Sequence, residues 1–163
     1  MKIDRDTIYG ELTHHGINQL FGHFSHDGNF MDIGSGYGKV VTAFNSIFQK
    51  KAFGIEIVKE KHDIAKKIWK NKPHKYEFIN GNFKDHFKIM DKCKYFYANC
   101  IMWKEETMTP LQDYFLNKRK KPFILIYNPL MVPIWPVKQN IIKLDVCWRD
   151  GGVTFYKLNT IND

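Results

Sequence analysis

The stretch Asn29-Phe-Met-Asp-Ile-Gly-Ser-Gly-Tyr-Gly-Lys39 decides the fold of this chain. Apolar residues around Asp32 predict a short buried strand over 30–33. The three glycines that follow predict a tight turn, because glycine has no Cβ and tolerates positive φ. Apolar residues at helical spacing then predict a helix over 40–48. A strand, a glycine turn and a helix N-terminus in this order are typical of the nucleotide-binding corner of an open α/β sheet.

The spacing of the glycines indicates which ligand this corner holds. The dinucleotide fingerprint is G-x-G-x-x-G, in which the third glycine lets helix and strand pack closely. Here the pattern is D-x-G-x-G-x-G, and Lys39 stands where that third glycine would fall. This pattern resembles the first motif of Rossmann-like methyltransferases, which bind S-adenosylmethionine (SAM). NAD binding and a purely structural turn are the alternatives at this point.

Strand-like and helix-like segments alternate along the rest of the chain, as in other α/β sheets. Strands are expected over 51–57, 76–80, 94–99 and 122–127, and helices over 13–24, 58–70 and 105–118. Two more strands, 141–148 and 153–158, are expected to form an antiparallel hairpin with Asp150-Gly-Gly152 as its turn. The chain therefore predicts a mostly parallel seven-stranded sheet with an antiparallel C-terminal hairpin.

Length and composition predict one folded domain. The 163 residues fit a single domain over 1–163, in which a loop and helix over 1–28 precede a core over 29–163. Its 44% hydrophobic and 26% charged residues are typical of a folded soluble protein. No apolar run approaches the roughly 20 residues of a membrane span, so no membrane association is expected. The N-terminus lacks the apolar core of a signal peptide, so an intracellular location, nuclear or cytoplasmic, is expected.

Cysteine and histidine do not predict a metal site. The three cysteines form no C-x-x-C pair, which argues against disulfides and a cysteine zinc site. His14 and His15 are adjacent and point in different directions, and no carboxylate or cysteine completes a tetrahedral set with His23 and His26. We therefore expect no bound metal.

The net charge of +8 favours a polyanionic partner. Only Arg5, Arg119 and Arg149 are arginines, however, and lysines give a diffuse positive field without bidentate readout. Non-specific contact with nucleic-acid phosphates is therefore compatible with the composition, and sequence-specific reading of DNA is not expected. The alternative is that the many lysines reflect an AT-rich, viral or streamlined genome, in which case the protein would act in a host cell.

Several residues at predicted strand ends suit a nucleoside ligand. Glu56 ends the second strand at nearly the spacing from Asp32 at which an acidic residue reaches a ribose hydroxyl pair. Asn82 and Phe83 follow the third strand, where an amide and a ring suit a purine, although turn chemistry is the alternative. Asn99 to Trp103 follow the fourth strand and are expected on the acceptor side. Asn128-Pro129-Leu130 is similar to the N-P-P-Y motif of adenine-N6 DNA methyltransferases but follows the next strand, so it is discounted.

Together these segments resemble the disruptor-of-telomeric-silencing family, the non-SET histone-lysine methyltransferases. The resemblance runs from Tyr9 to Asp163. Its motifs are Tyr-Gly-Glu at 9–11, Asp-Ile-Gly-Ser-Gly-Tyr-Gly at 32–38, Gly-Ile-Glu at 54–56, Gly-Asn-Phe at 81–83, Ala-Asn-Cys at 98–100 and Val-Cys-Trp…Val-Thr-Phe-Tyr…Thr-Ile at 146–161. The resemblance implies a Rossmann-like class I SAM-dependent methyltransferase fold, with SAM as cofactor and a histone in the nucleosome as partner.

Residue roles are carried over by position from the same resemblance. The implied cofactor-binding residues are Tyr9, Glu11, Leu12, Asp32, Gly34, Gly36, Lys39, Glu56, Asn82, Phe83 and Asn99. The implied lysine channel is lined by Thr13, Ile101, Trp103, Trp148 and Phe155, and Asn99, Trp148 and Phe155 are the implied catalytic residues. The Tyr-Gly-Glu segment would cover the cofactor, and Trp148 and Phe155 would flank an aromatic slot on the hairpin.

The chain departs from the family pattern at Lys39, Asn82, Cys100 and Phe155, where the family has a neutral polar residue, an aspartate, a second asparagine and a tyrosine. The expected function is SAM-dependent methylation of a histone lysine. The alternatives are the same chemistry on another protein or on RNA, and a SAM-binding or chromatin-binding module without turnover.

Overall fold

The computed structural model describes residues 11–25, 27–71, 75–129 and 135–160. Within them, seven strands form one sheet in the order β3-β2-β1-β4-β5-β7-β6. The strands are β1 (Phe30–Ile33), β2 (Ala52–Glu56), β3 (Tyr76–Asn80), β4 (Tyr95–Ala98), β5 (Ile124–Tyr127), β6 (Asn140–Val146) and β7 (Arg149–Asn159). β1 to β5 pair in parallel, while β7 is antiparallel to both β5 and β6. The expected α/β sheet with its antiparallel C-terminal hairpin is confirmed.

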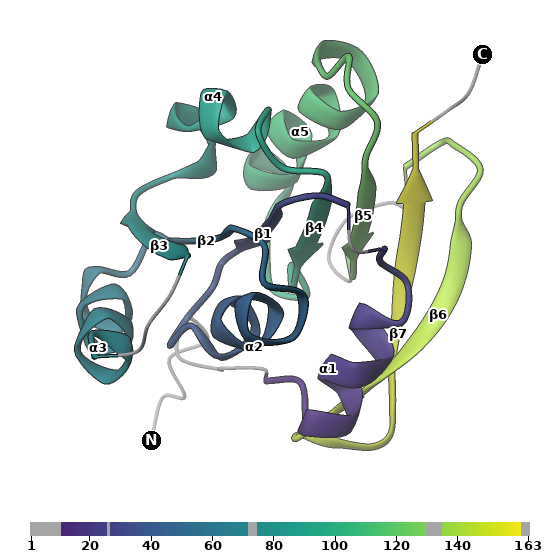
Figure 1. Cartoon of the computed structure of the whole chain (residues 1–163). Helices are drawn as coiled ribbons and strands as arrows, with labels where there is room; N and C mark the ends of the chain where they lie inside the picture. The colour runs from purple at the N-terminus through teal and green to yellow at the C-terminus, as the bar shows by residue number, and fades with distance from the viewer. Residues whose placement is uncertain (1–10, 26, 72–74, 130–134, 161–163) are drawn as a thin grey trace, which may run out of the picture.

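Helices cover both faces of the sheet (Figure 1). They are α1 (His14–Phe21), α2 (Lys39–Phe48), α3 (Lys59–Trp69), α4 (Phe87–Met90) and α5 (Glu105–Asp113), with a 3-10 turn η2 (Phe83–Asp85) and a π-helical turn η3 (Tyr114–Lys118) that continues α5. α1 packs against β6 at one end of the sheet, and α3 packs against β3 at the other end (Figure 1).

Two apolar layers sandwich the parallel strands. Successive side chains of a strand point to opposite faces, so Phe30 joins the layer with α1 and α2, whereas Met31 joins the layer with α4 and α5. All residues of β1, β2 and β4 are buried. Burial on both faces explains why these strands are mostly apolar without polar alternation, with Asp32 and Glu56 as the charged exceptions.

The C-terminal hairpin turns earlier than expected. Val146 pairs with Arg149, so the turn consists of Cys147 and Trp148, and the predicted turn at Asp150-Gly-Gly152 is wrong. Gly151 and Gly152 lie in β7 with φ of 80° and 79°, beside a register shift between Leu144 and Val146. The glycines therefore serve a bulge, where positive φ is also needed. A Cβ on Gly152 would lie 2.8 Å from the Leu144 carbonyl oxygen.

The first helix is also shorter than expected, because α1 ends at Phe21 rather than Phe24. The next N–H groups, of His23 and Phe24, donate to the carbonyls of Leu20 and Phe21 in tighter turns. Phe24 is nevertheless buried in the layer with α2, so the apolar pattern that predicted a longer helix still describes the core.

Gly16→Ala is expected to lower the free energy of unfolding by about 2 kcal/mol, even though alanine favours helices. A Cβ at Gly16 would lie 2.0 Å from the carbonyl oxygen of Asp145, so α1 must move off β6 to accept it. Urea unfolding measures the change. Gly22→Ala is the matched control, because its Cβ would meet no atom closer than 3.3 Å. Equal effects of the two substitutions would contradict the close packing of α1 on β6.

Candidate functional site

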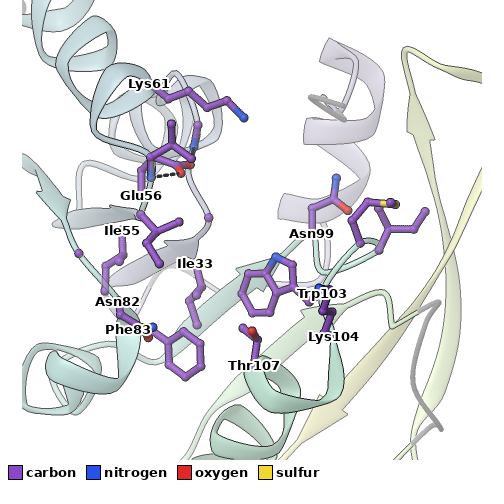
Figure 2. Close-up of a pocket in the computed structure, with 17 residues that line it drawn as sticks. Ile33, Ile55, Glu56, Lys61, Asn82, Phe83, Asn99, Trp103, Lys104 and Thr107 are labelled. Atoms are coloured by element: carbon purple, nitrogen blue, oxygen red, sulfur yellow. Dashed lines mark hydrogen bonds between the residues drawn. The ribbon is translucent and has the colours of Figure 1, made fainter. Parts of the chain in front are cut away.

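A cavity of about 490 Å³ lies at the carboxyl ends of the parallel strands, within the usual size range of small-molecule sites. Figure 2 shows Glu56 and Asn99 on opposite sides of it, with the rings of Phe83 and Trp103 lower in the view. The sequence-predicted residues that line it are Gly34, Gly36, Glu56, Asn82, Phe83, Asn99, Ile101 and Trp103. These residues come from four separate segments, which the parallel register brings to one edge.

The glycine turn adopts the expected backbone. Gly34, Gly36 and Gly38 have φ of 86°, 53° and 86°, a region that side chains rarely adopt. Gly38 is tightly packed, because a Cβ there would lie 2.5 Å from the Phe78 ring. The N–H of Gly34 donates to the Ile55 carbonyl over 2.8 Å, which fixes the turn to β2. A bare backbone shelf therefore borders the cavity.

Glu56 is buried and anchors the turn. One carboxylate oxygen accepts the N–H of Gly36 over 2.8 Å, and the other accepts the N–H of Val58 over 2.9 Å. A carboxylate has about four lone-pair sites, so both oxygens keep capacity for further donors such as hydroxyl groups. Glu56, the carboxylate predicted to bind ribose, therefore lines the cavity with acceptor capacity to spare.

Asp32 is buried in the sheet, just before the turn, and is not among the residues lining the cavity. Among the described residues, its Oδ1 finds no hydrogen-bond partner. Burial, with the charge of Glu56 as a smaller cause, raises the pKa of the Asp32 carboxyl well above its usual range. This buried carboxyl therefore contributes negative potential beneath the turn only when it ionises.

Asp32→Asn is expected to remove a loss of stability with rising pH. The folded state keeps the Asp32 proton after the unfolded chain releases it near pH 3.9, so the free energy of unfolding falls from there up to the raised folded-state pKa. The slope reaches at most about 1.4 kcal/mol per pH unit. Urea unfolding between about pH 4 and pH 8 should show that the free energy of unfolding of the asparagine variant rises relative to that of the wild type as the pH increases. A difference between the two proteins that is constant with pH would contradict this.

The segments that follow β3 and β4 face each other across the cavity. The rings of Phe83 and Trp103 are nearly parallel, at 4°, with centroids 5.9 Å apart. Asn82 precedes η2 and caps it, because its side-chain oxygen accepts the N–H of Lys84 over 3.1 Å. Purine binding and turn capping by Asn82 are therefore both compatible with the structure, because its amide caps a turn and the residue also lines the cavity.

Residues 11–13 form a second group with the hairpin end. Leu12 is buried and bridges Val146, and the N–H of Cys147 donates to the Glu11 carbonyl over 3.1 Å. The Lys39 ammonium donates to the Leu12 carbonyl over 3.2 Å and lies 3.9 Å from the Glu11 carboxylate. The segment before α1 is thus tied to the start of α2, beside the glycine turn.

Thr13 caps α1, since its hydroxyl oxygen accepts the N–H of Gly16 over 3.0 Å. The same hydroxyl donates to the Asp145 carboxylate. Tyr9 lies outside the described residues. Four predicted site residues therefore lie beside the glycine turn but do not line the 490 Å³ cavity itself: Glu11, Leu12, Thr13 and Lys39.

The expected aromatic slot between Trp148 and Phe155 is not formed. Phe155 has no exposed surface and stacks on Tyr97 in the layer with α1 and α2, with ring centroids 5.8 Å apart. Trp148 lies in the two-residue turn and is 37% exposed. The two residues differ because β7 directs Phe155 into the core, whereas the turn leaves Trp148 at the surface.

Several cavity residues were missed by the sequence reasoning. Ile57 and Val58 line the cavity although they are 65% and 38% exposed, and Lys61 and Lys104 line it as well. Their position in the sequence could have predicted them, because each lies shortly after a parallel strand, where ligand sites occur. Exposed apolar residues there offer a flat surface to a ring.

The described ranges hold no group of three His, Cys, Asp or Glu side chains that could bind a metal ion. In the same part of the chain, no helix has both the length and the apolar character needed to cross a bilayer.

Comparisons with known proteins agree with this geometry. A curated relative from Aspergillus fumigatus, the "Histone-lysine N-methyltransferase, H3 lysine-79 specific", is 25% identical over 190 residues. The match includes 93% of this chain but 36% of the relative, so the chain spans about a third of that protein's length.

Solved methyltransferase structures share the fold. An RNA methyltransferase from Salinibacter ruber, in complex with S-adenosyl-L-homocysteine, superposes with a TM-score of 0.65 at 15% identity, over 91% of this chain and 92% of that one. TrmK from M. capricolum, in complex with S-adenosyl-homocysteine, superposes with a TM-score of 0.64 at 12% identity, over 93% of this chain and 70% of that one. The family model described as "Histone methylation protein DOT1" matches residues 2–141. The chain therefore belongs to the DOT1 family of histone methylation proteins.

Proposed function

We propose that this protein is a SAM-dependent protein-lysine N-methyltransferase that acts on a histone in the nucleosome, and therefore in the nucleus. The observation that carries the proposal is the cavity at the glycine turn, with Glu56 on one side and Asn99 and Trp103 on the other. Membership of the DOT1 family over residues 2–141 supports the histone as substrate class.

The residues present fit SAM. Glu56 offers carboxylate oxygens to a ribose diol, and Phe83 with Ile57 offers apolar surface to an adenine ring. The glycine turn lets a ligand approach the backbone, and the buried Asp32 carboxyl beneath the turn adds negative potential there when it ionises. Tyr9, Glu11, Leu12 and Lys39 are proposed to close this side of the site, by way of their ties to the turn. When bound, SAM supplies an electrophilic methyl group on a sulfonium.

The chain's own part in the reaction is orientation and desolvation. A free lysine has a pKa of about 10.4, so its amine must lose a proton before it can attack. Apolar walls at Ile101 and Trp103 disfavour the ammonium form, and the charges of Lys61 and Lys104 at the same cavity act in the same direction. The proton can leave to water, and Asn99 is proposed to orient the reacting groups.

The hairpin residues are proposed to act outside the reacting cavity. Trp148, which is exposed at the turn, is proposed to meet an incoming histone segment, and Thr13 is tied to the same end of the hairpin through Asp145. Phe155 is proposed to hold the hairpin by its stacking on Tyr97. The net charge of +8 supports non-specific contact with nucleosomal DNA phosphates.

Methyl incorporation from labelled SAM tests the proposal, with nucleosomes, free histones and total RNA offered side by side and products mapped by mass spectrometry. Label on a histone lysine in nucleosomes is the expected result. Label on RNA alone, or on another protein alone, would overturn the substrate while leaving methyl transfer intact. Absence of label in a protein that binds SAM by calorimetry would overturn the enzyme assignment in favour of a binding module.

A further inference from the structure

We propose that Asn128 is a positioning residue that fixes the orientation of the Asn99 carboxamide at the cavity. The proposal rests on the proposed methyltransferase function, in which Asn99 orients the reacting groups. Asn99 directly follows β4, and Asn128 directly follows β5. These strands pair in parallel with Ala98 opposite Tyr127, so the register places the two asparagines side by side.

The hydrogen bonds of Asn128 determine which end of its amide faces Asn99. Its Oδ1 accepts the backbone N–H of Cys100 over 2.7 Å, and its Nδ2 donates to Oδ1 of Asn99 over 2.9 Å. A backbone N–H can only donate, so the oxygen of Asn128 must face Cys100. Its nitrogen must then face Asn99, which in turn must present oxygen. The order of donors and acceptors therefore sets both amide orientations.

Asn128, the inner member of the pair, is buried. Asn128 is 3% exposed, and Cys100 is fully buried with its thiol 3.3 Å from the Ala98 carbonyl. Burial raises the pKa of the Cys100 thiol to about 12, so it stays neutral beside the pair. An inverted Asn128 amide would set its N–H groups against the Cys100 N–H and its oxygen against the Asn99 oxygen, at a buried position. Inversion is therefore strongly disfavoured.

This arrangement defines what Asn99 can offer to a ligand. Because its oxygen is committed to Asn128, the Asn99 amide nitrogen is the end turned away from the pair. Asn99 lines the cavity opposite Glu56 (Figure 2), so an acceptor atom of the bound cofactor or substrate would meet an N–H donor there. Asn128 would touch neither ligand and would act through Asn99.

Asn128→Asp separates the orientation of the Asn99 carboxamide from the hydrogen bond that Asn128 accepts from the Cys100 N–H. An aspartate at 128 still accepts the Cys100 N–H, but its second oxygen faces Asn99 and demands a donor. The Asn99 amide must then invert and present oxygen to the cavity. Asn99→Ala is the complementary variant, because it removes the carboxamide on which Asn128 acts. Asn140→Asp, at an exposed position that starts β6, is the matched control for the added charge.

The experiment compares wild type, N128D, N99A, the N99A/N128D double variant and N140D. Methyl transfer to nucleosomes gives kcat and KM, calorimetry gives the affinity for S-adenosyl-homocysteine, and asparagine-selective ¹⁵N–¹H spectra report the Asn99 carboxamide. We expect N128D to lower kcat roughly tenfold or more, with KM within about threefold and a shifted Asn99 carboxamide signal. In the N99A background, N128D should change kcat less than about twofold, because its target is gone. N140D should behave as wild type.

Two outcomes would overturn the proposal: kcat of N128D within about twofold of wild type, or full multiplication of the two losses in the double variant. If N128D does not fold, as judged by circular dichroism, N128S takes its place with the same expectations, because serine cannot span both partners. If the wild type methylates no acceptor, the proposed function fails by itself. The spectra then still decide, because an unchanged Asn99 signal in the folded variant would overturn the positioning role.

Discussion

Arg119→Met is expected to lower the free energy of unfolding by about 4 kcal/mol. The Arg119 side chain is 1% exposed and fills the junction where η3 ends and β5 approaches. Its guanidinium donates to the carbonyls of Met90, Cys93, Lys121 and Pro122 and to the Tyr114 hydroxyl. Methionine matches the length of the side chain but donates to none of these acceptors, so the acceptors at the buried residues Met90, Cys93 and Tyr114 lose a donor.

The aromatic surroundings add to the cost. The guanidinium carbon lies 5.0 Å from the centre of the Phe96 ring and 5.8 Å from that of Phe123, so the charge also interacts with ring faces. Urea unfolding followed by circular dichroism gives the change. Arg149→Met, at an exposed position in β7, is the matched control and should stay within about 0.5 kcal/mol of wild type. If both substitutions lower the free energy of unfolding equally, Arg119 does not stabilise the junction between η3 and β5.

Glu56→Gln is expected to weaken SAM binding about 100-fold, or roughly 2.7 kcal/mol. Hydrogen bonds from ribose hydroxyls to a carboxylate are stronger than those to a neutral amide. Both oxygens of Glu56 also accept backbone N–H groups, from Gly36 and Val58. A glutamine nitrogen would face one of these donors, so the glycine turn would loosen as well.

Calorimetry with SAM and with S-adenosyl-homocysteine measures the loss. Glu60→Gln makes the same chemical change at an exposed position in the first turn of α3 and should bind as wild type does. Thermal unfolding separates a weaker site from a weaker fold. Wild-type affinity in a folded Glu56→Gln variant would rule out Glu56 as the ribose ligand.

Much of the fold follows from local features of the sequence. The glycine turn was predictable because positive φ at Gly34, Gly36 and Gly38 is a property of the backbone at those positions. Glu56 was predictable because its place at the end of β2 depends on two short segments and the parallel pairing between them. The apolar runs and periodicities likewise predicted the seven strands within the described ranges.

The hairpin shows where this reasoning stops. Asp150-Gly-Gly152 carries the composition of a turn, but the same positive φ also serves a bulge, and only pairing with β6 distinguishes the two. That pairing moved the turn to Cys147 and Trp148. It also directed Phe155 into the core, away from the ligand cavity.

By itself the sequence determined the α/β class, the glycine turn, the acidic residue after β2 and the family pattern, because these depend on neighbouring residues and on backbone freedom. The tertiary structure alone decided which side chains share the cavity. Lys104 at the cavity, the tie of Lys39 to Leu12 and the pairing of Asn99 with Asn128 all join segments distant in sequence. Strand register and packing set such contacts, and neither is encoded in any one stretch of the chain.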